Sequence, residues 1–218
     1  MRIALIDYRA GNLTSVKKAF AALAADLFVP AQPDELRSAE AIVVPGVGHF
    51  AATRALTPDW VGMIRNHVDA GRPLLGICLG MQWLFEGSEE DPQYPGLGLF
   101  PGRCYRLPSS VNGTVVKIPH VGWNALAERR RDTIVANVPA AAQVYFTHSF
   151  AAPITDDTVA VTEHGQPFAA IVQRGSVAGV QFHPEKSGEV GLQVLRNFLD
   201  VVRNASTKPR TGEEANPR

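Results

Sequence analysis

Two residue types that together can attack a carbonyl group, a cysteine and a histidine, stand in distinctive settings in this sequence. In Gly76-Ile77-Cys78-Leu79-Gly80, an apolar stretch runs into a cysteine and then into a helical pattern. A residue on such a tight strand-to-helix turn has a strained backbone, and glycines as second neighbours remove side chains that would clash. The start of a helix also favours the thiolate. We therefore predict that Cys78 is a nucleophile; the ordinary alternative is a buried small hydrophobe.

His183 has the best setting among the six histidines to serve as the base for this nucleophile. It follows the apolar stretch 177–182, and sites in open α/β sheets form where strands end. If the chain stays extended, Glu185 points in the same general direction and its carboxylate can orient the imidazole. The alternative is a solvated turn at Pro184. Cys78 lies 105 residues earlier (183 − 78), also after an apolar strand, so we expect both at one sheet edge.

A glycine-rich loop follows a further apolar stretch, at 41–44. Its residues Gly46, Val47 and Gly48 can present backbone N–H groups to an anion, although such a loop is more often a plain connection. Beside a nucleophile, the loop and the N–H of Leu79 are natural donors to a developing oxyanion. The phosphate-loop spacing GxxxxGK[ST] is absent from the sequence. Because glycines permit unusual dihedrals, a rotated peptide at Gly46 or Val47 would leave this oxyanion hole incomplete until a partner binds.

Apolar strands and helices alternate in the first half of the chain. We expect strands at 3–6, 41–44 and 73–77, and helices at 13–25, 58–70 and 79–85. This alternation indicates an α/β fold with a mostly parallel sheet covered on both faces.

The second half is rich in short β-like segments separated by turn residues. We expect strands at 102–107, 115–119, 144–150, 158–163, 169–174 and 177–182, followed by a helix at 190–202. These strands predict a mixed or antiparallel extension of the same sheet, within a single domain of residues 1–203. The polar stretch 204–218 is expected to be a disordered tail.

Composition and charge exclude several classes of protein. The 218 residues are 45% hydrophobic and 19% charged with a formal net charge of +0, as in an ordinary globular protein. There is no overall basic field for nucleic acid and no charge run for a membrane surface. Two cysteines do not make a disulfide framework, and we interpret Cys104 as structural. Without a signal peptide or an apolar run of roughly 20 residues, we expect a cytoplasmic protein.

Three motifs, PGVG, GICLGMQ and GVQFHPEKS, occur in the order found in the class I (triad) glutamine amidotransferases, which this chain resembles. DYRAGNL, FEGSEE, KIPHVGWN and YFTHSF sharpen the resemblance toward the glutaminase subunits of imidazole glycerol phosphate synthase, over roughly residues 2–200. The resemblance implies a flavodoxin-like fold, no cofactor or metal, and a thioester on Cys78 with His183 as base and Glu185 as its orienter. The oxyanion would be held by Leu79 and the loop of Gly46, Val47 and Gly48.

The resemblance also implies which residues bind the substrate and which face a partner. Glutamine would be held by Gln82, by Glu90 and by the segment His148, Ser149 and Phe150, since a glutamate suits an α-ammonium and an amide or N–H suits an α-carboxylate. Ammonia would pass to a (β/α)8-barrel cyclase subunit in a heterodimer. The residues expected to face that subunit are Asn12, Trp123 and Lys186.

Two positions depart from the family pattern. One residue expected to face the partner, Trp123, could instead have a structural role. Arg9 stands where relatives have a small residue, and Phe150 stands where tyrosine is common. For Trp123 the alternative is a core aromatic, whereas an exposed tryptophan is typical of interfaces.

Two other functions fit part of the pattern. An amidotransferase of another pathway, or a γ-glutamyl hydrolase, would share the triad motifs, but KIPHVGWN and YFTHSF argue against both. A non-catalytic flavodoxin-like module could use Cys78 as a redox sensor. Such a sensor requires neither His183-Pro184-Glu185 nor the loop at Gly46.

Overall fold

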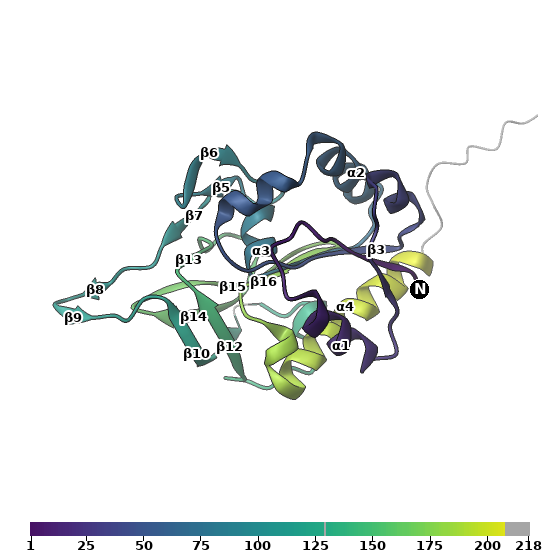
Figure 1. The fold of residues 1–218 in the computed structure, drawn as a ribbon. Coiled ribbons are helices and arrows are strands. Elements are labelled where there is room, and N and C mark those ends of the chain that lie inside the picture. Colours follow the sequence, from purple (N-terminus) through teal and green to yellow (C-terminus); the bar gives the residue numbers. More distant parts are fainter. Residues whose placement is uncertain (129, 208–218) are drawn as a thin grey trace, which may run out of the picture.

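An eight-stranded sheet forms the centre of the computed structural model, which describes residues 1–128 and 130–207 (Figure 1). In order across the sheet, the strands are β11 (Ala127–Glu128), β14 (Thr158–His164), β15 (Gln166–Arg174), β16 (Val177–Val180), β4 (Leu74–Ile77), β3 (Ala41–Val44), β1 (Ile3–Leu5) and β2 (Leu27–Phe28). The strands from β16 to β2 are parallel, and β15, β14 and β11 pair antiparallel. The predicted α/β class, with a mostly parallel sheet and an antiparallel extension, is confirmed.

The parallel strands are continuous apolar runs because both faces of the sheet are covered. In β3, Val43 faces one core, whereas Ile42 and Val44 face the other, as the two-residue period of a strand requires. Helices α1 (Leu13–Ala21) and α4 (Gly188–Thr207) pack on the first core. Helices α2 (Pro58–Asp69) and α3 (Leu79–Leu84) pack on the second. Figure 1 shows α2 on one side of the sheet and α1 with α4 on the other.

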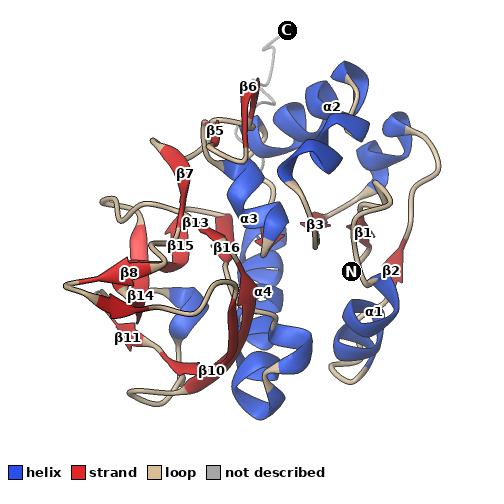
Figure 2. Cartoon of the chain, turned by 60° about the vertical axis from the view of Figure 1, so that its left-hand side comes forward, coloured by secondary structure: helices blue, strands red, loops and turns tan. Residues whose placement is uncertain are grey.

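Three small sheets lie outside the central one (Figure 2). Strand β10 (His120–Ala125) pairs with β12 (Gln143–His148); β13 (Phe150–Ala151), β7 (Arg103–Arg106), β5 (Gly87–Ser88) and β6 (Asp91–Pro95) form the second; β8 (Ser110–Val111) and β9 (Thr114–Val115) form the third. The expectation that 102–107 and 144–150 extend the central sheet is therefore wrong. Strand β12 alternates buried with more exposed residues, and in β7 only Cys104 is buried, so both suit a layer with one wet face.

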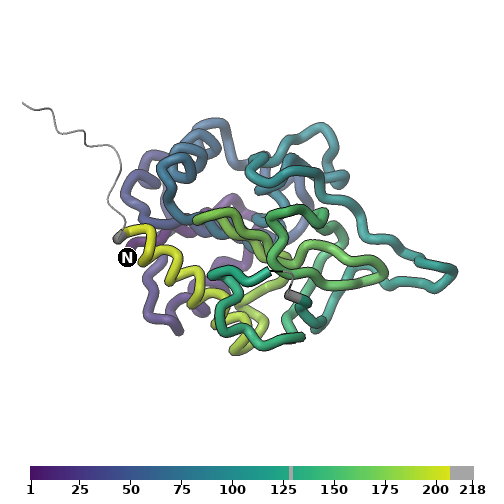
Figure 3. Tube along the Cα trace, turned by 180° about the vertical axis from the view of Figure 1, so that it is seen from behind, coloured from purple at the N-terminus to yellow at the C-terminus, as the bar shows by residue number. Residues whose placement is uncertain are grey.

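The expected strand at 115–119 is also wrong, because β9 ends at Val115 and the residues after it are not in a strand. The β8–β9 hairpin instead extends from the body of the molecule beside the turn that joins β14 to β15 (Figure 3). At this turn His164 Nε2 donates to the Lys117 carbonyl at 2.7 Å, and a side chain on Gly165 would meet Val116. The two hairpins thus support each other.

Short 3-10 helices make the remaining connections: η1 (Pro33–Ser38), η2 (Phe50–Ala55), η3 (Thr133–Val135) and η4 (Pro184–Lys186). Helix α4 runs to Thr207, so the first residues of the stretch expected to be disordered, 204–207, are helical. The rest of that stretch, 208–218, lies outside the described residues. Over residues 1–128 and 130–207, no helix is both long and apolar enough to span a bilayer.

Candidate active site

Cys78 occupies the sharp turn between β4 and α3. It is the N-cap residue of α3, is 4% exposed, and has a φ of 54° with a ψ of −109°. A positive φ at a non-glycine residue costs of order 1–3 kcal/mol, so the surrounding structure must hold the residue in place. Its N–H does so by donating to the Val180 carbonyl of β16 at 2.8 Å. The strained turn predicted from the sequence is therefore present.

The two glycines flanking Cys78 are required by close backbone contacts. A Cβ on Gly80 would lie 1.8 Å from the Val44 carbonyl oxygen, and a Cβ on Gly76 would lie 2.7 Å from the Met81 nitrogen. Real Cβ atoms do not approach other atoms so closely, so only glycine lets α3 fold back onto β3 and β4. The glycine bracket therefore sets the position of the thiol.

His183 follows β16, the parallel neighbour of β4, so the two strand ends bring the predicted base and the predicted nucleophile together. The register pairs Val180 with Ile77, which places the residues just after each strand at the same edge of the sheet. The His183 N–H donates to the Tyr145 carbonyl of β12 at 2.9 Å. The expected convergence of the two strand ends is confirmed.

Glu185 holds the imidazole of His183. The Nδ1 of His183 donates to Glu185 Oε1 at 2.8 Å, and the two side chains are 2% and 3% exposed. The chain does not stay extended here as expected, because Pro184–Lys186 forms η4. The Ser187 hydroxyl fastens this turn by donating to the His183 carbonyl at 2.7 Å. The carboxylate thus reaches the ring through a tight turn rather than along a strand.

The electrostatics of His183 favour a charged ring. Burial lowers its pKa, but the neighbouring Cys78 and the hydrogen-bonded Glu185 carboxylate more than offset burial and raise the pKa to about 10. The Nε2 atom has no well-formed hydrogen bond among the described residues, so it remains available for proton transfer. A thiolate paired with an imidazolium is the reactive state of a cysteine nucleophile.

In the loop after β3, two of the candidate oxyanion donors, the N–H groups of Val47 and Leu79, are engaged in hydrogen bonds within the protein. The N–H of Leu79 donates to the Gly46 carbonyl at 3.3 Å, and the N–H of Val47 donates to the Ala10 carbonyl at 2.5 Å. The Gly46 carbonyl therefore stands where an oxyanion would have to lie, and the N–H of Val47 points at another segment of the chain. The structure thus has the rotated of the two peptide orientations that Gly46 and Gly48 permit.

The side-chain amides of Gln82 and Gln181 form a chain of hydrogen bonds that ends at Cys78. Gln82 Nε2 donates to the Phe150 carbonyl at 2.7 Å and to Gln181 Oε1 at 3.1 Å. Gln181 Nε2 in turn donates to Cys78 Sγ at 3.7 Å, from a fully buried side chain. Gln181 is not among the site residues predicted from the sequence. The available signal was its place one residue after Val180, which a correct β16–β4 register puts beside Cys78.

His148 lies in the same hydrogen-bonded chain. Its Nδ1 donates to the Phe150 carbonyl at 2.8 Å, so its Nε2 accepts from His120 Nδ1 at 3.1 Å, and His120 Nε2 accepts from Asn124 Nδ2 at 3.2 Å. Burial, with smaller help from neighbouring histidines, lowers the pKa of His148 to about 3 and that of His120 to about 4. Both rings are thus neutral, and both nitrogens of His148 are used within the protein.

Glu90 and Ser149 border the site from other segments. Glu90 Oε2 accepts from the N–H of Phe50 at 2.7 Å, at the start of η2 and two residues past Gly48. The Ser149 carbonyl accepts from the N–H of Leu107 at 2.9 Å, between β12 and β13. Glu90 thus lies beside the loop of Gly46, Val47 and Gly48, which we call the oxyanion loop. Ser149 joins β12 to β13, next to the Phe150 carbonyl that accepts from Gln82.

The residues expected at a partner interface are exposed. Trp123 is 56% exposed, which excludes the core-aromatic alternative, and its ring lies edge-on to Tyr145 at 6.0 Å. Lys186 Nζ lies 5.8 Å from the same tyrosine ring. Asn12 is exposed at the start of α1, where its side chain caps the helix by accepting from the N–H of Ser15. Asn12 therefore has a structural task that needs no partner.

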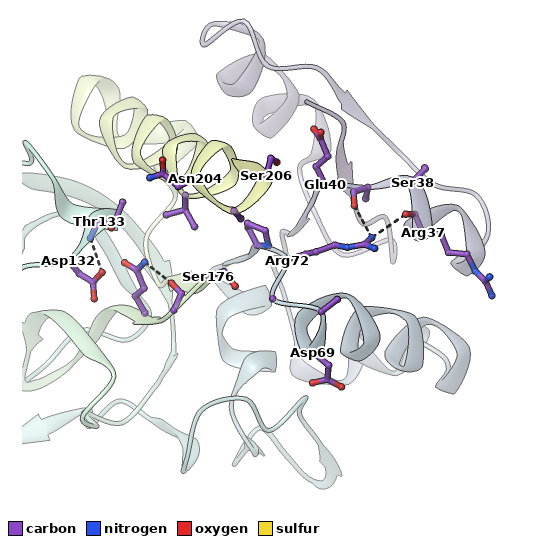
Figure 4. A pocket seen from close by; sticks show the side chains of 18 residues that line it. Arg37, Ser38, Glu40, Asp69, Arg72, Asp132, Thr133, Ser176, Asn204 and Ser206 are labelled. Atoms are coloured by element: carbon purple, nitrogen blue, oxygen red, sulfur yellow. Dashed lines mark hydrogen bonds between the residues drawn. The ribbon is translucent and has the colours of Figure 1, made fainter. Parts of the chain in front are cut away.

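A broad hollow of about 1400 Å³ lies at the other end of the parallel strands from Cys78 and His183 (Figure 4). Its lining includes Glu40, Arg72 and Ser176, which precede β3, β4 and β16, whereas Cys78 and His183 follow β4 and β16. Sites in open parallel sheets form beyond the carboxyl ends of the strands. The hollow is therefore separate from the chemistry described above.

We expect Glu185→Gln to slow glutamine hydrolysis by about 10²- to 10⁴-fold, because an amide can present the wrong group to Nδ1 and carries no charge to stabilise the imidazolium. The pKa of His183 should fall from about 10, since Glu185 helps to raise it. Kinetics and NMR titration of the histidines measure both effects. Glu189→Gln, an exposed change four residues along the chain, is the matched control. An unchanged His183 titration would contradict the role given to Glu185.

Comparison with known proteins places this geometry in a family. The profile of the glutamine amidotransferase class-I family matches residues 4–202. Imidazole glycerol phosphate synthase subunit HisH of Lactiplantibacillus plantarum is 45% identical over 203 residues, covering 91% of this chain and 95% of that protein. Subunit HisH of Moorella thermoacetica is 44% identical over 207 residues, covering 93% of this chain and 96% of that protein.

The fold has solved counterparts as well. PurLQS from Thermotoga maritima superposes with a TM-score of 0.70 over 91% of this chain and 97% of that chain, at 21% identity, which supports the fold alone. The family profile and the relatives in turn cover nearly the whole chain, including the segments that carry Cys78, His183 and Glu185. The chain therefore belongs to the class-I glutamine amidotransferases, in the family of the imidazole glycerol phosphate synthase subunit HisH.

Proposed function

We propose that this chain hydrolyses glutamine to glutamate and ammonia through a thioester on Cys78, as the glutaminase subunit of an imidazole glycerol phosphate synthase. The observation that carries the proposal is the pairing of a strained, buried cysteine after β4 with a buried histidine–glutamate pair after β16. The names of the relatives favour histidine biosynthesis over the other amidotransferase pathways. A redox sensor would have no use for the Glu185–His183 pair.

The reaction follows from the chemistry of these three side chains. Cys78 Sγ attacks the side-chain amide carbon of glutamine, and the carbonyl oxygen becomes an oxyanion. His183 gives its Nε2 proton to the amide nitrogen, the C–N bond breaks, and ammonia leaves. Water then gives a proton to His183 and attacks the thioester, and the C–S bond breaks to release glutamate. Glu185 keeps the ring oriented and balances its charge throughout.

The oxyanion hole must open before this chemistry runs. In this structure the Gly46 carbonyl accepts from the N–H of Leu79. Its oxygen is partially negative and would repel an oxyanion at the same position. Rotation of the Gly46–Val47 peptide removes that carbonyl, frees the N–H of Leu79 and brings the N–H of Val47 toward the oxyanion. Gly48, with a φ of 98° and no described atom within 4 Å of an added Cβ, gives the loop room to turn. In its resting state the chain is therefore a slow glutaminase.

Substrate recognition is assigned to the residues around the thiol. Glu90 takes the α-ammonium of glutamine, because its carboxylate has acceptor capacity beyond the one bond to Phe50. Gln82 and the segment His148, Ser149 and Phe150 take the remaining polar groups. Since both ring nitrogens of His148 are engaged, that segment acts through its backbone.

The ammonia passes to a (β/α)8-barrel cyclase subunit in a cytoplasmic heterodimer, which makes imidazole glycerol phosphate and an aminoimidazole carboxamide ribonucleotide. Trp123 is the anchor of that interface, because a half-exposed tryptophan beside Tyr145 and Lys186 offers both apolar area and a cation. Asn12 extends the same contact from α1, which lies beside η4.

A glutaminase assay with and without the barrel subunit and its nucleotide ligand tests the proposal. We expect activation by at least about 10²-fold, since one missing oxyanion donor costs about 10²- to 10³-fold in rate. The Cys78→Ala chain, mixed with the same barrel subunit, supplies the background rate. Full activity of the lone chain, unchanged by the barrel, would contradict the assignment to this synthase, and no activity in either case would contradict the glutaminase.

A further inference from the structure

The hydroxyl of Tyr8 is a buried donor that finds no acceptor in the described part of the chain. Tyr8 is 5% exposed, and its Oη has no hydrogen-bond partner among the described residues. Tyrosine hydroxyls normally find a partner when buried, because the cost of leaving one unpaired is large. Burial and, second, the charge of Cys78 raise the pKa of Tyr8, so the hydroxyl keeps its proton. An unpaired donor held beside the nucleophile calls for an explanation.

The hydroxyl lies directly against the oxyanion loop. A Cβ on Gly46 would fall 2.0 Å from Tyr8 Oη and 2.8 Å from Leu79 Cβ. Tyr8 therefore fills the space that a side chain at position 46 would occupy, over the α-carbon about which the Gly46–Val47 peptide turns. The segment after Tyr8 also holds the loop, through the Ala10 carbonyl that accepts from Val47.

Rotation of the Gly46–Val47 peptide changes which backbone groups are paired. Before it, the Gly46 carbonyl accepts from Leu79 and the N–H of Val47 donates to Ala10. After it, the two N–H groups serve the oxyanion, while the Gly46 carbonyl has lost its donor. A buried carbonyl without a donor opposes the rotation. The nearby Tyr8 hydroxyl, unpaired at rest, is chemically suited to supply that donor.

We propose that Tyr8 is a positioning residue of the oxyanion hole, whose hydroxyl donates to the Gly46 carbonyl once the Gly46–Val47 peptide has rotated. The proposal deepens the proposed function and rests on it. In the resting state the unpaired hydroxyl destabilises the closed loop, and in the rotated state its new hydrogen bond stabilises the open one. Both effects move the equilibrium toward the active hole, without any contact between Tyr8 and glutamine.

Tyr8→Phe tests this role, because it removes one oxygen atom and keeps the ring that packs on Gly46. In the heterodimer with the barrel subunit and its nucleotide ligand, kcat should fall by at least about tenfold, with little change in the KM for glutamine. Alkylation of Cys78 by iodoacetamide develops no oxyanion, so its rate should stay within about twofold of wild type. The melting temperature should not fall, since the hydroxyl has no partner to lose at rest.

Tyr105→Phe is the matched control. Its hydroxyl donates to the Pro167 carbonyl at 3.2 Å on an exposed edge, so its loss should leave hydrolysis unchanged. Unchanged hydrolysis in Tyr8→Phe would overturn the proposal. Hydrolysis and alkylation falling together would also overturn it, because Tyr8 would then act on the thiol, and a lower melting temperature would show that the hydroxyl is paired at rest.

The wild-type measurement distinguishes failure of this proposal from failure of the proposed function. A wild-type heterodimer that releases no ammonia from glutamine defeats the glutaminase and the role of Tyr8 together. A wild type that works, beside a Tyr8→Phe variant that works equally well, defeats the role of Tyr8 alone.

Discussion

Cys78→Ala is expected to abolish glutamine hydrolysis, by at least about 10⁴-fold, because it removes the thiol that forms the thioester. The fold should survive, since alanine keeps the Cβ and every backbone contact of a residue held at a φ of 54°. Binding of the proposed partner subunit should also survive, because Cys78 is buried, whereas the proposed interface residue Trp123 is exposed. Ammonia release, circular dichroism and titration with the partner measure the three effects.

Cys104→Ser is the control for this result. Cys104 is fully buried, its Sγ contacts the Gln82 carbonyl at 3.7 Å, and burial raises its pKa, so it stays an unreactive thiol. Its substitution should leave hydrolysis in place. Ammonia release that persists in Cys78→Ala would show that the nucleophile is elsewhere.

Gly80→Ala adds a single methyl group and should be the most destabilising substitution of this kind in this part of the chain. Its Cβ would lie 1.8 Å from the oxygen and 2.7 Å from the carbon of the Val44 carbonyl, both in the backbone of a central strand. Either β3 or α3 must shift, and α3 carries the thiol. We expect a loss of about 3 kcal/mol or more in the free energy of unfolding. The melting temperature should fall by about 6–12 °C, together with hydrolysis.

Gly62→Ala separates this steric effect from the general effect of replacing glycine. Gly62 lies inside α2, and an added Cβ would meet no described atom within 4 Å. Alanine there should stabilise the chain by up to about 1 kcal/mol, because alanine is the better helix former. Equal stability of Gly80→Ala and wild type in urea unfolding would mean that α3 does not press on β3.

The local part of the site could be predicted from the sequence, because it depends on neighbours in the chain. The turn at Cys78 follows from the glycines two residues to either side. The pairing of His183 with Glu185 is predicted for an extended chain, whereas a tight turn brings the two side chains together. The convergence of the two segments is predicted because each of them follows an apolar strand. Their residue roles stay proposals that the experiments above test.

The remainder depends on strand register and on side chains distant in sequence. Gln181 could not be placed beside Cys78 without knowing that Val180 pairs with Ile77. Strand β10 was missed because its alternation is broken by Gly122 and it is half exposed. The blocked oxyanion loop was only one of two possibilities, since glycines at 46 and 48 permit either peptide orientation.

The position of β16 between β4 and β15 also has a consequence for how the chain matures. Until β16 is synthesised, the edge of β4 is unpaired, because its neighbour lies about 100 residues further along the chain. A nascent chain that ends before Val177 thus exposes a sheet edge beside a cysteine that has no base. The proposed nucleophile thus gains its proposed base only when the last part of the domain has been synthesised.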